Sequence, residues 1–475
     1  MKKIIHFALV VLAGMAVFSA CTKSGTDGPI NPPQPPPTNA DTVIISKKQM
    51  RAVWMATVWG LDWPMNQYGM AAQKKLYTDY LDKLKSLNMN AVFVQVKGMG
   101  DAFYNSPYEP WSASITGTRD KDPGYDVMKF MIDEAHSRGI EFHAWLNPFR
   151  IATRAGSSTP YPALHASVKP EWVTSHEKIQ VYNPAVPEAR QRLADIVKDI
   201  VSKYAVDGIH MDDYFYPDPS AAGTMVSDQP DFEKYGSGFT DIKAFRRANV
   251  DQSIKGVYDA IVSTKPEVVF SISPTSNFDY NLNTLYADIV KWAKEGWMDV
   301  VIPQIYQHSS FNTRLNDWDR FNDKPHLMVG HAIYTGSGIV STPADLSNEL
   351  SLTKQKKNVV GNLFYSAKYL NEKPEFAAKF AEIFLSPAVI PFLGRAVAPA
   401  PASPQNLRLE GNTLKWSTSG NVRSVVYHTS DLKTESKVLA ITTANELAVS
   451  TNGIYTVTAI NADNMESKAA KYVTK

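Results

Sequence analysis

The amino-acid sequence predicts an α/β protein in which a (β/α)8 TIM barrel is followed by a small C-terminal β-sandwich. Eight β-leaning segments with helical patterns between them extend over roughly 340 residues, the number and size expected of such a barrel with long loops. The glycine-rich phosphate turn that would follow the first strand of a doubly wound open sheet is absent. Near the carboxyl end the pattern changes to short alternating segments separated by turn residues.

The composition is that of an ordinary globular protein. The chain has 475 residues, of which 44% are hydrophobic and 20% charged, and its net charge is +2. This balance gives no sign of a nucleic-acid partner, because nucleic-acid binding requires a strong basic excess. The aromatic content of 11%, with ten tryptophans, favours stacking on carbohydrate rings.

The amino end is predicted to be a signal peptide over residues 1–21. Lys2 and Lys3 precede an apolar run over residues 4–18, which is too short to span a bilayer as a mature helix. The run ends at Cys21, the single cysteine of the chain, and resembles a bacterial lipoprotein signal. That resemblance implies lipidation of Cys21 and a membrane anchor in the cell envelope, on its periplasmic or surface side. The proline-rich residues 22–46 are predicted to be an extended tether.

The barrel is predicted over residues 47–395. Helical patterns cover residues 72–87, 125–138 and 187–204, and Gly139 ends the second of them. The fourth strand is the stretch that begins at Asp207. The other predicted strands are residues 51–58, 91–97, 140–147, 267–273, 299–307, 326–334 and 358–366.

Residues 396–404 form a predicted linker of proline and alanine, and residues 405–475 a β-sandwich of the fibronectin type III kind. The predicted strands are residues 407–416, 424–428, 438–442 and 454–460. No catalytic constellation is present in this part, so a spacer or a weak glycan-binding module is the expected role.

The candidate site centres on residues 207–217. The first half of this stretch alternates as a strand does, and Asp212 and Asp213 lie where the strand gives way to a loop. Barrel enzymes carry their chemistry at this edge. His210, Asp212 and Tyr214 should share one face of the strand. The structural alternative is an acidic loop that caps the next helix.

Polar and aromatic residues also occur at the carboxyl ends of the other strands, where they would converge on one mouth. Each has a structural alternative, such as a glutamine that bridges buried backbone groups, an asparagine that holds a turn or an arginine that pairs with an acid. The substrate-binding candidates are Trp54, Trp59, Trp63, Gln95, Lys97, Asn147, Arg150, His210, Tyr214, Tyr216, Gln304, Tyr306 and Tyr365.

Five motifs resemble the glycosyl hydrolase-like 10 family, and the likeness covers about residues 47–385. The motifs are residues 54–58 (WMATV), 61–64 (LDWP), 144–150 (AWLNPFR), 207–217 (DGIHMDDYFYP) and 303–306 (PQIY). The resemblance implies a bacterial TIM-barrel hydrolase of glycosidic bonds, and a relative that cleaves peptide-free peptidoglycan strands suggests one substrate class. A fainter likeness to the chitinase strand motif covers Asp207, Gly208 and Asp212, but His210 and Tyr214 replace its acids.

Glycosidic cleavage needs one protonated carboxyl and one carboxylate. We expect Asp212 to be the nucleophile or the stabiliser of the oxocarbenium-like centre. Asp213, or an acid from another loop such as Asp101, Asp279 or Asp288, would donate the proton. Asp213 reaches the site only if the strand has already ended, because neighbours on a strand point to opposite faces. An adjacent pair would also suit a substrate-assisted route through a 2-acetamido group.

The expected substrate is a bacterial or dietary polysaccharide, and no cofactor is expected. No His-Glu-x-x-His pattern occurs, so no metal site is predicted, and His143 and His210 are expected to be hydrogen-bonded barrel residues. The alternative function is a non-catalytic glycan-binding lipoprotein that has kept the sugar site of a barrel.

Overall fold

The structure, a computed structural model, describes residues 42–156, 158–219, 223–320, 325–395 and 398–475. The predicted signal peptide, Cys21 and the tether up to residue 41 lie outside the described residues. Among the helices of the described part, none is both long and apolar enough to cross a bilayer.

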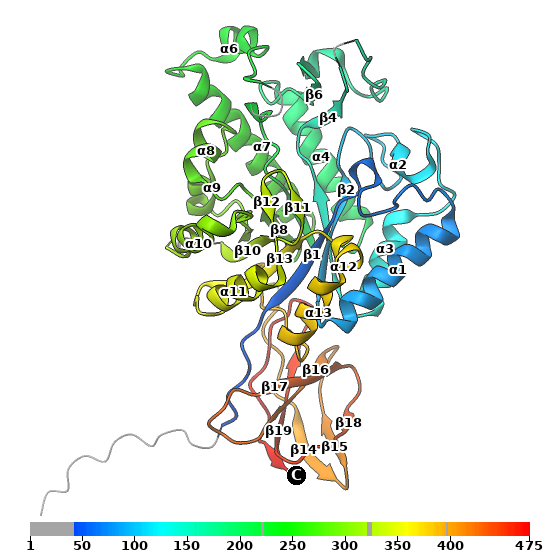
Figure 1. Cartoon of the computed structure of the whole chain (residues 1–475), viewed down its shortest axis with the longest axis vertical. Helices are drawn as coiled ribbons and strands as arrows, with labels where there is room; N and C mark the ends of the chain where they lie inside the picture. Colours follow the sequence, from blue (N-terminus) through cyan, green and yellow to red (C-terminus); the bar gives the residue numbers. More distant parts are fainter. Residues whose placement is uncertain (1–41, 157, 220–222, 321–324, 396–397) are drawn as a thin grey trace, which may run out of the picture. The chain divides into compact units, whose positions relative to one another are not determined.

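Eight parallel strands close into a barrel in the order β1-β2-β3-β7-β8-β9-β10-β13 (Figure 1). These are the eight predicted strands, so the predicted (β/α)8 barrel is confirmed. Their bounds are β1 Met50–Met55, β2 Ala91–Lys97, β3 Glu141–Leu146, β7 Gly208–Met211, β8 Val269–Ile272, β9 Val300–Val301, β10 His326–Ala332 and β13 Val359–Tyr365.

Because side chains alternate along each strand, one hydrophobic core forms inside the barrel and another between the strands and the surrounding helices. On β1, Ala52 and Trp54 face the barrel interior, whereas Val53 and Met55 pack against the surrounding helices. All residues of β2 are buried, as both faces of a parallel strand in a barrel must be. The barrel is therefore a filled core, and open space is available only beyond the strand ends.

A helix follows each strand and packs outside the barrel (Figure 1). Local signals set the helix ends: Gly139 takes a positive φ of 70° just after α3, and Thr342 and Asp345 form a capping box that begins α11. The helices are α1 Met70–Ser86, α3 Val127–Ser137, α4 Pro187–Lys203, α7 Ile242–Thr264, α9 Ile289–Glu295, α10 Phe311–Asp319, α11 Pro343–Lys354 and α13 Pro374–Ile383.

The loops at the carboxyl ends carry structure that the sequence did not predict. Between β3 and α4, the strands β4 Arg150–Thr153, β5 Val173–His176 and β6 Ile179–Tyr182 form a three-stranded sheet. The short helix α2, Ala113–Thr116, lies in the loop after β2. Of these insertions, β4 contributes Arg150 to the lining of the candidate site.

The C-terminal part contains two antiparallel sheets, β14-β15-β18 and β17-β16-β19-β20. The predicted strand over residues 407–416 is wrong, because Gly411 takes a positive φ of 59° and turns the chain into a hairpin of β14 Gln405–Glu410 and β15 Thr413–Ser417. The remaining strands are β16 Arg423–Thr429, β17 Lys437–Thr442, β18 Glu446–Ala448, β19 Ile454–Ile460 and β20 Val473–Thr474.

Candidate active site

A cavity of about 360 Å3 opens at the carboxyl ends of the barrel strands. Residues from β1, β2, β3 and β13 and from the segments after β7, β8, β9 and β10 line it, so the predicted convergence of strand ends does occur. Ten predicted site residues line this cavity: Trp54, Trp59, Gln95, Arg150, Asp212, Asp213, Tyr214, Gln304, Tyr306 and Tyr365.

Asp212 and Asp213 both line the cavity because β7 ends at Met211. The condition under which Asp213 reaches the site is therefore met. Asp212 is 3% exposed, and its Oδ2 accepts a hydrogen bond of 2.9 Å from Trp145 Nε1. Its Oδ1 accepts longer hydrogen bonds of 3.4 Å from Asn147 Nδ2 and from the Tyr214 backbone N–H.

Asp213 is half-buried, and its Oδ1 accepts a hydrogen bond of 3.1 Å from Gln304 Nε2. The same amide nitrogen donates to the Ser273 carbonyl oxygen at 2.8 Å. Gln304 therefore bridges a buried backbone group, as its structural alternative expected, and also holds a carboxylate in the cavity.

Both carboxyls have raised pKa values. Burial raises the pKa of Asp212 to about 7, and the charge of Asp213 adds to the rise. Burial likewise raises the pKa of Asp213 to about 6, although the hydrogen bond from Gln304 opposes it. Two neighbouring carboxyls that titrate near neutrality can share one proton, which is the state that acid catalysis of glycoside cleavage needs.

Arg150 lies beside the acids without pairing with one. Its Nε donates a hydrogen bond of 3.1 Å to the Gly98 carbonyl oxygen, and its guanidinium lies 4.5 Å from the centroid of the Tyr214 ring. Among the described residues it has no ion-pair partner, although it is only 6% exposed. Its charge lowers the pKa of both Asp212 and Asp213, against the larger effect of burial.

His210 does not line the cavity but is fully buried next to Trp54 and Ser273, which do. Its Nδ1 contacts Ser271 Oγ at 2.8 Å, and its Nε2 accepts a hydrogen bond of 3.1 Å from Trp54 Nε1. Ser273 Oγ lies 3.0 Å from the same Nε2. Burial, together with the nearby His143, holds the pKa of His210 well below its usual value. His210 is thus a hydrogen-bonded barrel histidine that orients Trp54.

Gln95 and Asn147 shape the site through the backbone. Gln95 Oε1 accepts hydrogen bonds from the backbone N–H groups of Thr57 (3.2 Å) and Val58 (2.9 Å) and so fixes the turn after β1. Asn147 Oδ1 accepts the Arg150 backbone N–H at 3.2 Å while its amide nitrogen reaches Asp212. Gln95 therefore bridges buried backbone groups and Asn147 holds a turn, which are the structural roles given above as alternatives to substrate binding.

Tyrosines form one wall of the cavity. Tyr306 and Tyr365 lie with ring centroids 6.3 Å apart, and Trp54 lies 6.5 Å from Tyr306 in an edge-to-face arrangement. Tyr334 and Tyr369 extend this wall and stack on each other at 5.8 Å. Neither tyrosine was among the predicted site residues, although Tyr334 ends a predicted strand. Trp145 belongs to the motif at residues 144–150 but was not predicted to bind substrate, and it lines the cavity and contacts Asp212.

Three predicted site residues lie elsewhere. Trp63 is fully buried and donates from Nε1 to the Gln73 carbonyl oxygen at 3.0 Å, so it belongs to the core. Lys97 follows a register irregularity in the pairing of β2 with β3 and donates to the Met99 carbonyl oxygen at 2.9 Å. Tyr216 is 2% exposed and packs on Tyr286.

The reserve acids do not line the cavity either. Asp279 is exposed in the first turn of helix α8, Phe278–Asn283. Asp288 caps α9 by accepting the Lys291 backbone N–H at 3.0 Å, so its role is structural. Asp101 lines a neighbouring cavity. Among the described lining residues, Asp212 and Asp213 are the only acids. No cluster of three or more possible metal ligands occurs in the described part of the chain.

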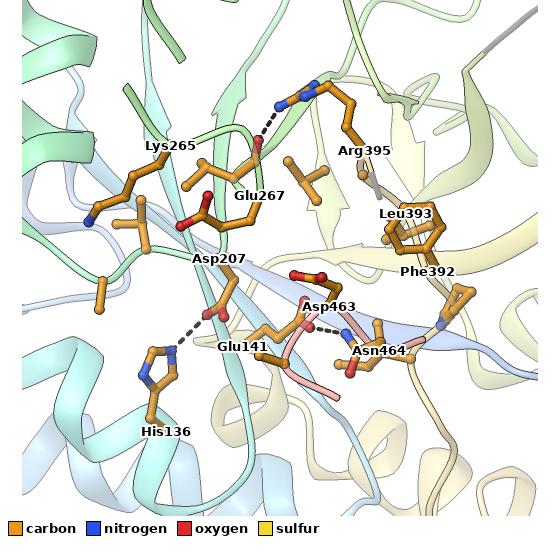
Figure 2. A pocket seen from close by; sticks show the side chains of 18 residues that line it. His136, Glu141, Asp207, Lys265, Glu267, Phe392, Leu393, Arg395, Asp463 and Asn464 are labelled. Atoms are coloured by element: carbon orange, nitrogen blue, oxygen red, sulfur yellow. Dashed lines mark hydrogen bonds and ion pairs between the residues drawn. The ribbon is translucent and has the colours of Figure 1, made fainter. Parts of the chain in front are cut away.

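A different cavity, of about 270 Å3, lies at the amino ends of the strands (Figure 2). Asp207 lies there, next to His136 at 2.7 Å, and accepts the Phe142 backbone N–H at 2.7 Å. Asp207 is thus far from the acid pair along β7 and has a structural role. Groups at this end of a barrel serve stability.

The chain is similar to known proteins over most of its length. The chain is 35% identical over 421 residues to the glycosyl hydrolase YngK of Bacillus subtilis, with 82% of this chain and 81% of that protein covered. It is 31% identical over 424 residues to the glycosyl hydrolase DigH of Escherichia coli K12, with 79% and 95% covered. The solved glycoside hydrolase domain of PgaB (BpsB) from Bordetella bronchiseptica is similar at 12% identity and a TM-score of 0.47, covering 70% of this chain and 98% of that one.

The family model described as glycosyl hydrolase-like 10 matches residues 49–351, which contain the acid pair and seven of the eight barrel strands. At the general level this family match and the relatives named glycosyl hydrolase support a glycosidase. The chain belongs to the glycosyl hydrolase-like 10 family.

Proposed function

We propose that this protein hydrolyses glycosidic bonds of a bacterial or dietary glycan, with Asp212 and Asp213 as its acid pair. One observation carries the proposal: two adjacent carboxyls with raised pKa values lie together in a cavity walled by aromatic rings. Rings of this kind stack on sugars, and the pair can supply one acid and one carboxylate. Peptide-free peptidoglycan strands are the first substrate to test, because the family resemblance suggests them.

The contacts favour different roles for the two acids. Asp212 is the more enclosed, and N–H groups of Trp145 and Asn147 stabilise its ionised form. Part of its raised pKa comes from the charge of Asp213, and that part disappears when Asp213 holds the proton. We assign Asp213 as the proton donor. Asp212 then attacks the anomeric carbon, or orients a 2-acetamido group that does so.

The test is the release of reducing ends from a panel of glycans that includes peptide-free peptidoglycan strands. Asp212→Asn and Asp213→Asn should each lower kcat at least 100-fold while binding of the strands is retained. Asp279→Asn is the matched control, because this exposed aspartate lies on α8 outside the cavity. A glycoside with a good leaving group should restore cleavage in Asp213→Asn and leave Asp212→Asn inactive.

The alternative is a glycan-binding protein without turnover. The same assay decides, because binding of a glycan by the unmodified protein without cleavage of any member of the panel would contradict the hydrolase and support the binder. The intact acid pair, with both carboxyls in the cavity, favours the hydrolase.

We also propose that the mature protein is a lipoprotein of the cell envelope. The charged and apolar run before Cys21, followed by a proline-rich stretch, supports lipidation of this cysteine. The two C-terminal sheets fit a fibronectin type III module that acts as a spacer or a weak glycan binder. Membrane fractionation of the unmodified protein and of Cys21→Ser tests the anchor. We expect the unmodified protein in the membrane fraction and the variant in the soluble fraction.

A further inference from the structure

A second cavity, of about 380 Å3, lies directly beside the one that holds the acid pair. The two cavities share Val58 and Trp59 in their common wall. The second cavity is bordered by the segment after β2, by the start of α2 and by β4, that is, by the loop insertions above the barrel. The second cavity therefore adjoins the cavity of the acid pair across this shared wall.

Trp59 is held in the shared wall by an anchored turn. It is 62% exposed and has a positive φ of 54°, which is strained for a tryptophan. Gln95 Oε1 fixes the Val58 N–H on one side, and the buried Asp62 accepts the Ala56 N–H at 2.7 Å on the other. An exposed indole in a backbone fixed by two buried polar side chains indicates a ring that is kept available to a ligand.

The second cavity also offers polar groups suited to sugar hydroxyls. Asp101 lines it, is 9% exposed, and accepts no hydrogen bond from any residue in the described part of the chain. Arg119 lines it too, and its Nη2 donates to the Gly100 carbonyl oxygen at 2.6 Å. A carboxylate with free acceptor capacity beside an aromatic face is the combination that binds a hydroxyl-rich ring.

We propose that the second cavity is a subsite for a further saccharide ring of the same glycan chain, with Trp59 as the platform between the two positions. This inference rests on the proposed function, because it specifies that the glycan substrate is an extended chain that occupies both cavities. With rings bound on both sides of Trp59, the acid pair cleaves within a chain, and affinity should grow with chain length until the subsite is filled.

The test fills the cavity and leaves the acids untouched. Ala113 is exposed and lines the second cavity but not the first, so Ala113→Trp should block the subsite. Ala72→Trp, at an exposed position of α1, is the matched control. With peptide-free peptidoglycan strands fractionated by length, we expect Ala113→Trp to raise KM at least tenfold for long strands while kinetics on the shortest cleaved fragment stay unchanged.

Asp101→Asn provides a second variant that preserves volume, and it should weaken binding of long strands in the same length-dependent way. Equal kinetics of the unmodified protein and both variants at every length would overturn the subsite while leaving the hydrolase intact. If the unmodified protein cleaves no glycan strand, the proposed function fails, and the subsite is then tested by calorimetric titration of the glycan strands. The subsite predicts that Ala113→Trp binds long glycan strands more weakly than Ala72→Trp does, and equal affinities would overturn it.

Discussion

At the scale of single residues, the site balances burial against hydrogen bonding and charge. Burial raises the pKa of Asp212 and Asp213, whereas N–H groups and the Arg150 guanidinium lower it. The balance leaves the two carboxyls titrating at about 7 and about 6. A free aspartate would be fully ionised at these pH values and could donate no proton.

The pH dependence of catalysis follows from this balance. Cleavage requires one protonated and one ionised acid, so kcat/KM should be highest between about pH 6 and 7 and fall on both sides. Arg150→Gln removes a charge that lowers both pKa values, so both limbs of the profile should move to higher pH. Rate profiles of the two proteins on one glycan measure the shift, and coincident limbs would contradict the assigned role of Arg150.

The acid pair should make the fold less stable as pH rises from about 4 to about 7. The pKa values of Asp212 and Asp213 in the folded protein, about 7 and about 6, lie above the usual value near 3.9, so between these limits the folded pair holds a proton that the unfolded state has lost. The free energy of unfolding therefore falls as pH rises through this window, by up to about 1.4 kcal/mol per pH unit. Asp212→Asn should flatten that slope and be the more stable protein at pH 8.

Urea unfolding of the two proteins between pH 5 and 8 measures this effect. Asp279→Asn serves as the matched control, because this aspartate is exposed and lies outside the cavity. Parallel slopes of Asp212→Asn and the unmodified protein would mean that the buried carboxyl is already ionised without cost.

Sequence reasoning found the acid pair and most of the residues around it, and its errors have physical causes. The alternation of side chains predicts which face of the barrel a residue lies on only as long as the strand continues with regular pairing. The register irregularity between Gln95 and Lys97 takes Lys97 out of the site. Trp63 and Tyr216 lie beyond their strand ends, where the chain path depends on tertiary packing. Tyr369 lies at the start of a short helix after β13, not at the end of a strand. The alternation of a strand therefore could not predict that it lines the site.

At the scale of elements, the barrel strands were predictable because long buried apolar runs mark them. The length of β9 was predicted wrongly, because the strand has two residues, whereas the predicted strand over residues 299–307 has nine. Pro303 has no N–H to donate and interrupts the ladder, and Gln304 resumes it only as isolated bridges to Thr275 and Gly330. The sheet β4–β6 was not predicted, since its four-residue strands are too short for alternation to be distinctive.

The start of β7 depends on a glycine. A Cβ atom at Gly208 would lie 2.2 Å from His143 Nδ1, and the buried His143 ring is stacked on Phe93. Gly208→Ala should therefore lower the free energy of unfolding by about 1–3 kcal/mol, as overpacking does. Adding His143→Ala should recover part of that loss, because it removes the clashing ring. Denaturant unfolding of the single and double variants tests this, and equal stabilities of Gly208→Ala and the unmodified protein would contradict it.

At the scale of the whole molecule, the proposed active site and a buried ion pair lie at opposite ends of the barrel. At the amino end, Arg395 Nη1 contacts both carboxylate oxygens of the largely buried Asp299 at 2.6 and 2.5 Å, and Asp299 Oδ2 also accepts the Phe270 backbone N–H at 2.7 Å. Arg395 thereby joins the segment after β13 to the starts of β8 and β9. Sequence periodicity could predict the barrel, but not this pairing of residues 96 positions apart.

Removing the arginine should separate the two properties. Arg395→Met leaves Asp299 without its cation, so the free energy of unfolding should fall by about 3 kcal/mol. Below the melting transition, kcat/KM should stay unchanged, because the acid pair lies at the other end of the strands. Thermal denaturation and glycan kinetics on the same preparation measure both, and a loss of activity in a fully folded variant would contradict this separation.

The early end of β7 at Met211 makes the proposed acid pair dependent on strand length as well as on residue identity. A strand that continued two residues further, through Asp213, would turn that carboxyl outward toward the helices, and the protein would keep both aspartates yet lose the proposed donor. The same motif at the end of a longer strand would then predict a lectin instead of a hydrolase. The distance in sequence between the last ladder bond and the acids therefore carries information that the presence of two aspartates does not.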